Sequence, residues 1–435
     1  MTKRMLLAIL LLIVFALPAG CQKQGGEPTQ PTAPAPTILP THTPEPSPTP
    51  TPDPVGEALA GMTVEQKAAQ LLVAGIEGTE PGEDAVQAVQ GYQVGGVILF
   101  GRNVESAEQL AALTNGLKEL NGDYTPLFLC VDQEGGRVDR MPPEVTDLPS
   151  ALDFGSIAAP EARMDACFTL GQTLAAQCAA FGFNMDFAPS LDIWSNPENT
   201  VIGDRAFGTD AATVTGAANE TALGILSGGV IPVAKHFPGH GDTAVDSHYG
   251  LPVVDKSLEE LEELELRPFR QAIDTTCVYG TYGGDTSIPA IMVAHILLSQ
   301  IDPDNPASLS PEVVTGLLRE EMGYEGVVCT DDLTMGAISN TYGMGEAAVL
   351  AVEAGCDLLL VCHGADNLAA AHAALVEAVE SGRISMERLD ESVYRVLSLK
   401  AVYGLSNAPV EAPDIEVLND RIAALERSIE ADTSQ

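Results

Sequence analysis

The chain has 435 residues, of which 61 are acidic and 21 are basic, so its formal net charge is −40. A charge this negative argues against binding to nucleic acid and against electrostatic attachment to anionic lipids. Hydrophobic residues make up 45% of the chain, which is enough to bury the core of one large domain or two ordinary ones.

Residues 1–21 have the form of an export signal. A short basic start precedes an unbroken apolar run from Met5 to Leu17, which is too short to span a membrane comfortably as a mature helix. The run ends in Leu-Pro-Ala-Gly-Cys, which resembles a bacterial lipoprotein cleavage site, although Pro18 stands where an aliphatic residue is usual. The resemblance implies lipidation of Cys21 and an exported protein held on the extracytoplasmic side of the cell membrane. A plain signal peptide and an uncleaved anchor are the alternatives.

Residues 22–55 consist mainly of Pro, Thr, Gln, Glu and Ser, with almost nothing apolar to bury. Such a segment cannot offset the entropy that ordering would cost, and its Thr-Pro pairs favour extended polyproline II. We predict a disordered tether, with a proline-rich segment that binds a partner as the alternative.

Short apolar runs then alternate with amphipathic segments, such as residues 107–120 and 257–273. Thr63, with Gln66 three residues later, has the form of a capped helix start. The alternation predicts parallel strands joined by right-handed helical crossovers. Eight runs within about 350 residues favour one (β/α)8 TIM-type barrel over an open doubly wound sheet. The predicted strands are residues 71–75, 94–100, 127–131, 184–188, 229–234, 290–295, 326–331 and 357–362.

We expect the barrel to occupy residues 56–405 and a short tail to occupy residues 406–435. The tail holds a loop and one helix-like stretch over residues 417–430. Nothing after Leu405 could form a second α/β domain, so barrel loops alone must complete any site at the strand ends.

Residues 235–248 read Lys-His-Phe-Pro-Gly-His-Gly-Asp-Thr-Ala-Val-Asp-Ser-His and contain three of the chain's seven histidines. The pattern predicts that the preceding strand ends at residue 234 and opens into a loop that Gly239 and Gly241 make flexible. An exposed loop that carries polar residues without a function is one interpretation. A zinc site is another, although no His-x-Glu or Cys-x-x-Cys spacing supports it. A catalytic loop held by a rigid scaffold is the third.

This stretch resembles the signature of family 3 of the glycoside hydrolases, in its β-N-acetylglucosaminidase branch. There, Lys-His-Phe-Pro-Gly-His-Gly is followed by Asp-x-His on a mobile loop. The resemblance covers roughly residues 59–405 and implies a (β/α)8 barrel that needs no metal or cofactor. It also implies that His248 is the general acid/base and that Asp246 polarises it. Histidine titrates near neutrality, so one ring can give a proton and later take one back.

A retaining glycosidase also needs a nucleophilic carboxylate. The segment Thr-Asp-Asp-Leu-Thr-Met, residues 330–335, resembles the nucleophile motif of the same family, in which the first aspartate attacks. This makes Asp331 the expected nucleophile. Asp332 is the rival, although in a simple strand it would point the opposite way. Two adjacent acids also occur as caps at the start of a helix.

The resemblance places sugar contacts in three further motifs. These contacts fall on Asp132, Arg140, Arg205, Lys235 and His236, and an ordinary surface salt bridge is the alternative for each. Glu134 and Arg137 are interpreted as braces behind them. Residues 277–286 are longer than the usual family connection and either reshape the leaving-group subsite or form a surface excursion.

Together these features imply a retaining β-N-acetylglucosaminidase that acts on glycans ending in N-acetylglucosamine, such as peptidoglycan fragments. A β-glucosidase or β-xylosidase of the same family is one alternative. A phosphorylase that uses the same intermediate but takes phosphate as acceptor is another. From a different class, the chain could be a lipid-tethered sugar-binding protein without activity. No protein partner is evident.

Overall fold

The computed structural model describes residues 53–243, 245–275 and 288–433. The predicted signal peptide with Cys21, nearly all of the predicted tether and the segment 277–286 lie outside the described residues. Among the helices that the structure does describe, none combines the length and apolar character needed to cross a lipid bilayer.

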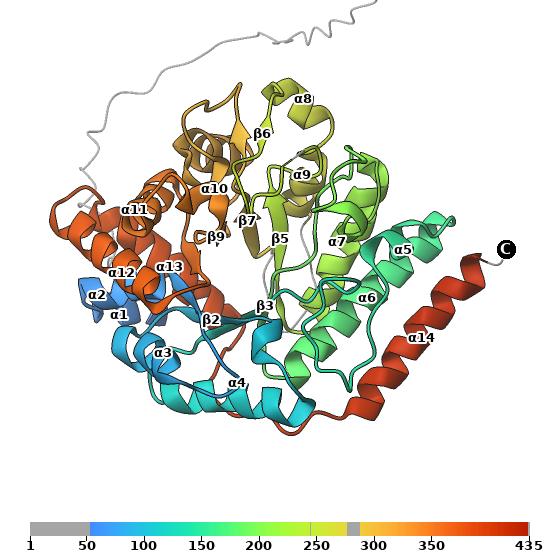
Figure 1. Cartoon of the computed structure of the whole chain (residues 1–435), viewed down its shortest axis with the longest axis horizontal. Coiled ribbons are helices and arrows are strands. Elements are labelled where there is room, and N and C mark those ends of the chain that lie inside the picture. The colour runs from blue at the N-terminus through green and yellow to red at the C-terminus, as the bar shows by residue number, and fades with distance from the viewer. Residues whose placement is uncertain (1–52, 244, 276–287, 434–435) are drawn as a thin grey trace, which may run out of the picture. The chain divides into compact units, whose positions relative to one another are not determined.

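Eight parallel strands close into a barrel that helices surround, which confirms the predicted TIM-type (β/α)8 fold (Figure 1). Each strand pairs with its neighbours along the chain, and β1 pairs with both β2 and β10 to close the ring. Every predicted strand run overlaps one of these strands, the weak candidate at residues 71–75 included. The barrel strands are β1 Leu72–Gly75, β2 Gly96–Leu99, β3 Phe128–Val131, β4 Met185–Asp186, β5 Ile231–Phe237, β7 Ala290–Val293, β9 Val327–Asp332 and β10 Leu358–Val361.

The helices begin where the sequence offers caps. Thr63 forms a capping box with Gln66 at the start of α2, as predicted, and Ser106 caps α4 through the amide of Gln109. The helices are α1 Pro54–Ala60, α2 Val64–Gln70, α3 Glu83–Val86, α4 Ala107–Asn121, α5 Ala151–Gly155, α6 Pro160–Ala180, α7 Ala211–Ser227, α8 Leu258–Glu263, α9 Arg267–Asp274, α10 Gly336–Ser339, α11 Met344–Ala354, α12 Ala365–Glu380, α13 Met386–Val402 and α14 Ile415–Thr433. Shorter 3-10 and π-helical segments are η1 Gln87–Tyr92, η2 Gly101–Asn103, η3 Gly203–Arg205, η4 Ala307–Leu309 and η5 Glu312–Glu321.

Both faces of the barrel strands are buried, which explains why their sequences are nearly continuous apolar runs. On β1, Val73 points into the barrel, whereas Leu72 and Ala74 pack outward against the helices. The interior is filled by alternate residues of the strands, including Phe128 and Met185. The barrel is therefore a packed core that can hold side chains rigidly at its rim.

Strand β5 is longer than predicted. The sequence placed its end at residue 234, but β5 continues through Lys235 and His236 to Phe237. The backbone of Lys235 bonds to Pro189 and Leu191 on one side, and the carbonyl of Phe237 accepts from the amide of Ala294 on the other. These bonds extend the ladder past the apolar run, so two of the predicted site residues stand on the strand itself.

The predicted helix over residues 257–273 is two helices, α8 and α9. Leu264 leaves helical geometry, and Pro268, which has no backbone N–H to donate, lies in the first turn of α9. A two-stranded parallel sheet lies outside the barrel and was not predicted from the sequence. It is formed by β6 Val253–Val254 and β8 Leu297–Leu298.

The helix predicted at residues 417–430 is α14. It lies along the outside of α6, and Arg421 donates a hydrogen bond to the carbonyl of Gln172 there (Figure 1). Leu418, Ile422 and Leu425 are buried in the same apolar cluster as the barrel's outer core. The end of the chain thus contributes to the packing around the barrel.

Candidate active site

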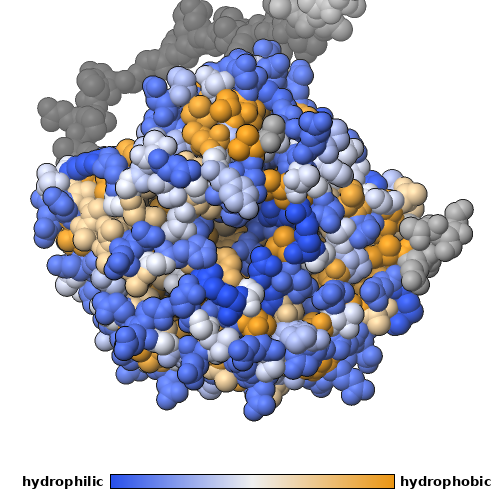
Figure 2. All heavy atoms as spheres, in the orientation of Figure 1, coloured by the Kyte–Doolittle hydropathy of each residue, from blue (hydrophilic) through white to orange (hydrophobic). Residues whose placement is uncertain are grey.

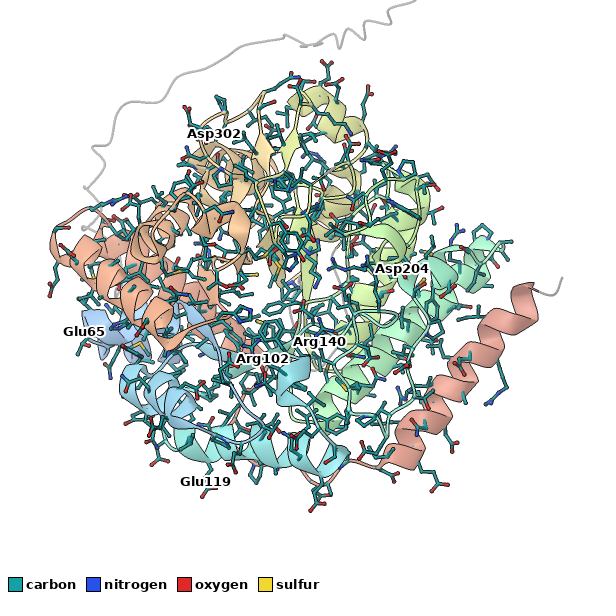
Figure 3. All side chains as sticks on the ribbon, viewed as in Figure 1. Glu65, Arg102, Glu119, Arg140, Asp204 and Asp302 are labelled. Carbon is teal, nitrogen blue, oxygen red and sulfur yellow. The ribbon has the colours of Figure 1, made fainter. Side chains whose placement is uncertain are left out.

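A cavity of about 360 Å³ opens at the carboxyl ends of the barrel strands. The space-filling view shows hydrophilic side chains around a hollow at the middle of this face (Figure 2). Arg140 lies near this centre, whereas Glu119 points outward from α4 (Figure 3). All eight residues that the sequence analysis assigned to the site line the cavity, namely Asp132, Arg140, Arg205, Lys235, His236, Asp246, His248 and Asp331.

One side of the cavity is a network of paired charges. Lys235 on β5 places its Nζ atom 2.5 Å from Oδ1 of Asp132 and 2.7 Å from Oε1 of Glu134. Arg205 grips the same Glu134 with two hydrogen bonds of 2.7 and 2.9 Å. Burial favours a protonated Glu134, but the two cations outweigh it and hold the pKa of this carboxyl well below its usual range. Glu134 is therefore an anion that fixes two cations.

The loop that carries Arg205 is braced from outside. Arg137 pairs with Asp204 at 2.7 Å and donates to the carbonyls of Val201 and Ile202. The side chain of Arg137 is nearly half exposed, so it supports the loop at the surface. Glu134 thus holds Lys235 and Arg205, and Arg137 holds the loop of Arg205; both also line the cavity, and Glu134 is the more deeply buried of the two.

His236 is held by an acid that the sequence analysis did not assign. Asp192 accepts from Nδ1 of His236 at 2.6 Å and from the backbone N–H of His240 at 2.6 Å. Nε2 of His236 lies 3.4 Å from Arg205, which can only donate, so Nδ1 carries the proton toward Asp192. Burial opposes ionisation of Asp192, but His236 outweighs burial and lowers the pKa of this carboxyl to about 2. The bond spans 44 residues of sequence, so no spacing rule could find it.

Asp331 and Asp332 close strand β9 in different environments. The carboxylate of Asp332 accepts from the amide and hydroxyl of Thr334 and from the amide of Cys362. That of Asp331 accepts the amide of Asp332 at 2.8 Å. Burial favours protonation of Asp331, but His295, His236 and this amide outweigh it, so the pKa of Asp331 lies below its ordinary value. Asp332 is fastened to its own loop, while Asp331 is an ionised group at the cavity.

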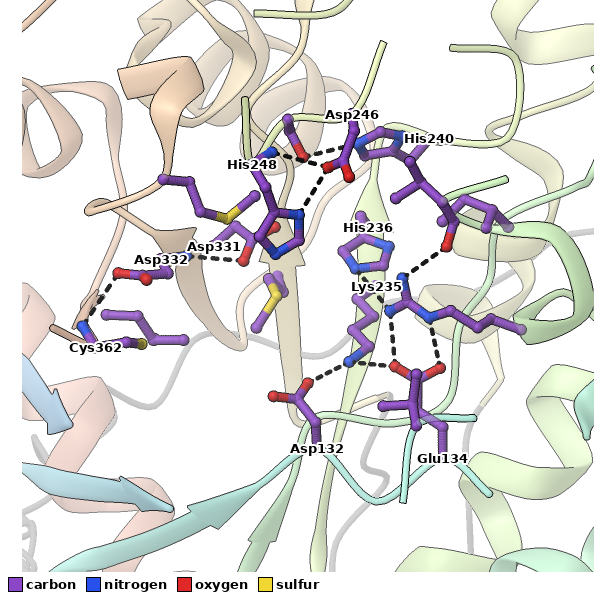
Figure 4. A pocket seen from close by; sticks show the side chains of 18 of the residues that line it. Asp132, Glu134, Lys235, His236, His240, Asp246, His248, Asp331, Asp332 and Cys362 are labelled. Carbon is purple, nitrogen blue, oxygen red and sulfur yellow. Dashed lines mark hydrogen bonds and ion pairs between the residues drawn. The ribbon is translucent and has the colours of Figure 1, made fainter. Parts of the chain in front are cut away.

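On the opposite side, Asp246 and His248 form an exposed pair. Oδ1 of Asp246 lies 2.7 Å from Nδ1 of His248 and 2.9 Å from its backbone nitrogen. The side chain of His248 is 64% exposed and that of Asp246 is 33% exposed. Because Asp246 occupies Nδ1, Nε2 is the ring atom left for proton transfer. Figure 4 shows Asp331 and His248 facing the same cavity from different elements.

Gly239 and Gly241, which the sequence predicted to make the loop flexible, stand where the backbone itself requires glycine. Gly239 adopts φ +128°, a region that L side chains rarely enter. A Cβ atom on Gly241 would stand 1.7 Å from the carbonyl oxygen of Ile193. These two positions need glycine because the loop turns sharply and packs closely there.

Two residues that line a further wall of the cavity were not predicted from the sequence. Phe100, which follows β2, and His363, which follows β10, both line the cavity and stack with ring centroids 5.7 Å apart. The guanidinium of Arg102 lies 4.6 Å from the Phe100 ring centre. The only sequence signal for these residues is their place after barrel strands. Within the described part of the chain, no group of three or more His, Cys, Asp or Glu side chains is placed to hold a metal ion.

Comparison with known proteins agrees with this geometry. A family model described as the N-terminal domain of glycosyl hydrolase family 3 matches residues 63–399. A β-hexosaminidase from Nitrosomonas eutropha is 35% identical over 331 residues, which cover 75% of this chain and 91% of that protein. A β-hexosaminidase from Methylococcus capsulatus is 40% identical over 287 residues, which cover 66% of this chain and 80% of that protein.

A solved structure supports the same relationship. The family 3 β-N-acetylglucosaminidase of a Paenibacillus species is 41% identical, with a TM-score of 0.77 over 85% of this chain and 69% of that chain. The family match spans most of the described barrel and includes the residues that line the cavity. This protein is therefore a hydrolase that belongs to glycosyl hydrolase family 3.

Proposed function

We propose that this protein is a retaining β-N-acetylglucosaminidase that removes terminal β-linked N-acetylglucosamine from glycans. The relatives support this substrate class, since they are described as β-hexosaminidases and a β-N-acetylglucosaminidase. The observation that carries the proposal is that an ionised carboxylate, Asp331, and an Asp246–His248 pair line one cavity.

The reaction proceeds in two displacements. A carboxylate oxygen of Asp331 bonds to the anomeric carbon while the bond to the leaving oxygen breaks, and Nε2 of His248 gives that oxygen a proton. In the second step His248 takes a proton from water as the water oxygen displaces Asp331. Asp246 holds the ring through Nδ1 and stabilises the imidazolium form. Asp332 is a weaker candidate for nucleophile because three hydrogen bonds engage its carboxylate.

The sugar in the cavity is held by the charged residues on the other side. Asp132, Arg140, Arg205, Lys235 and His236 offer carboxylate, guanidinium, ammonium and imidazole groups to hydroxyls of one ring. Buried fixed charges of this kind do not need to reorganise when substrate enters, so they orient the anomeric carbon toward Asp331.

The direct test is turnover of a chromogenic N-acetyl-β-glucosaminide. We expect Asp331→Ala to lower kcat/KM on this substrate by about 1,000-fold or more, and His248→Ala to do so on diacetylchitobiose, whose leaving group needs a proton. Asp304→Ala, at an exposed position, and His372→Ala, at a partly buried one, are matched controls away from the cavity and should leave kcat/KM unchanged. Full activity in Asp331→Ala would remove the assignment.

The same assay separates the alternatives. Faster cleavage of a β-glucoside or β-xyloside than of the N-acetylglucosaminide would indicate a different member of the family. Product analysis by NMR, with and without phosphate, should show β-configured N-acetylglucosamine; a sugar phosphate would identify a phosphorylase. Binding without turnover would indicate a sugar-binding protein.

We further propose that the protein is exported, lipid-anchored through Cys21 and active on peptidoglycan fragments. The support is the sequence of residues 1–21 and the proline-rich segment 22–55, which suits a spacer between an anchor and the barrel. Labelling of cells with a palmitate analogue should mark the protein, and Cys21→Ser should abolish the label. Release of N-acetylglucosamine from purified muropeptides would test the substrate.

A further inference from the structure

Ser247 is buried although it stands between the partly buried Asp246 and the exposed His248. It is only 2% exposed, and its Oγ atom lies 3.2 Å from Nε2 of His240. Its carbonyl accepts from the amide of Ala337 at 3.0 Å, and the carbonyl of His248 accepts from the amide of Gly336 at 3.1 Å. The segment that carries His248 is therefore held on one side by the Ser247 side chain and on the other by the backbone carbonyls of Ser247 and His248.

His240 is itself fixed from several directions. Oγ1 of Thr243 lies 2.7 Å from its Nδ1, Asn199 donates to its carbonyl at 2.8 Å, and its amide donates to Asp192 at 2.6 Å. Burial, with the neighbouring His236, lowers the pKa of His240 to about 4, so the ring is neutral near pH 7. A neutral ring has one donor and one acceptor nitrogen, and hydroxyls both donate and accept, so the ring can bond to Thr243 and Ser247 at the same time.

The hydrogen bonds on the two sides of Ser247 connect it to the residues around His236 and to those around Asp331. His240 shares Asp192 with the sugar-facing His236. The backbone bonds of Ser247 and His248 lead to Ala337 and Gly336, at the start of α10, which follows strand β9 and its Asp331. The position of the segment is thus set relative to both the sugar-holding side and the expected nucleophile.

We propose that Ser247, through its hydrogen bond to His240, is a positioning residue that sets His248 at the distance from Asp331 at which it can protonate the leaving group. The inference rests on the proposed role of His248 and deepens it. The rate of proton transfer depends strongly on where the general acid stands, since a shift of about 1 Å can cost about 100-fold in rate.

The test compares two leaving groups in Ser247→Ala. Diacetylchitobiose has a sugar leaving group that needs protonation, whereas a 2,4-dinitrophenyl N-acetyl-β-glucosaminide leaves without it. The ratio kcat/KM reports the first displacement only. We expect kcat/KM for the disaccharide to fall by about 100-fold and that for the dinitrophenyl substrate to change by less than about 3-fold. Activity on the second substrate also shows that the variant is folded.

Two further variants complete the test. His240→Gln should likewise lower kcat/KM for the disaccharide and not for the dinitrophenyl substrate. The double variant should lose no more kcat/KM than either single variant, because the two substitutions remove the same interaction. Ser339→Ala, at an exposed serine of α10, is the matched control and should change neither value. Equal losses on both substrates, or no loss, would overturn the proposal.

The outcome is separable from that of the proposed function. If His248→Ala fails to discriminate between the two leaving groups, the acid/base assignment itself is wrong. If His248→Ala discriminates and Ser247→Ala does not, only the positioning role of Ser247 fails.

Discussion

The two sides of the cavity are built in opposite ways. On the sugar-holding side, the side chains of Lys235, Glu134 and Arg205 are 2%, 5% and 13% exposed and are paired with one another. On the other side, His248 is largely in solvent and is held by Asp246. Buried charges persist only when they are paired, so the first side is a rigid structure.

The difference follows from what each side has to do. Holding a sugar in one orientation needs groups that do not move, and strand ends of a packed barrel supply them. A proton donor must meet a leaving group in one step and a water molecule in the next, so it has to remain accessible. In the proposed mechanism, the protein thus combines a fixed binding surface with an accessible proton carrier whose position Ser247 sets.

The largest effect is expected when the buried network loses its shared anion. Glu134→Ala leaves Lys235 and Arg205 as facing cations without their common partner, and breaking such a pair costs about 3–5 kcal/mol of unfolding free energy. Urea denaturation followed by the fluorescence of Trp194, the single tryptophan of the chain, measures this loss. A loss below about 1 kcal/mol would show that the two sides differ less than their burial indicates.

A smaller effect is expected from pH acting on Asp192. Its pKa is about 2 in the folded protein and 3.8 in an unperturbed carboxyl. Because the folded value is lowered, the stabilisation is present above pH 4 and is lost as the pH falls from about 4 to about 2. It amounts to about 2 kcal/mol of unfolding free energy. The stability difference between the wild type and Asp192→Asn should shrink by this amount across that window, and a constant difference would contradict the assigned role of this carboxylate.

The smallest effect is expected at an exposed ion pair. Glu346 pairs with Arg383 at 2.8 Å, but its side chain is half exposed, so water screens the charge. Glu346→Ala should change the unfolding free energy by less than about 1 kcal/mol. This variant is the matched control for Glu134→Ala, since both variants remove a glutamate that pairs with an arginine. Equal losses in the two variants would remove burial as the reason for the difference.

The fold was readable from the sequence because a parallel barrel repeats one signal. Each strand is buried on both faces and therefore appears as a short apolar run, and the polar residues that end the runs mark the rim. The errors came where backbone pairing overrode composition. Lys235 and His236 are polar, yet the hydrogen bonds of β5 continue through them.

The residues of the candidate site could be predicted from the sequence only through the motifs that contain them. The resemblance of the motifs to those of a known family indicated which residues would gather. The pairings that define their charge states join residues far apart in the chain, such as Lys235 with Asp132 and Glu134. For the same reason the sequence did not reveal that Ser247 would be buried beside the exposed His248. Side-chain partners across different strand ends depend on the closed barrel and not on local pattern.

The identity of the nucleophile is the most direct test of this account. A 5-fluoro N-acetylglucosaminyl fluoride forms the covalent intermediate quickly, but this intermediate is hydrolysed slowly. The labelled enzyme can therefore be digested and the masses of its peptides measured by mass spectrometry. The account predicts one added fluorosugar on Asp331, and no label in Asp331→Ala. A label on Asp332, or turnover of the reagent with inversion at the anomeric carbon, would contradict it.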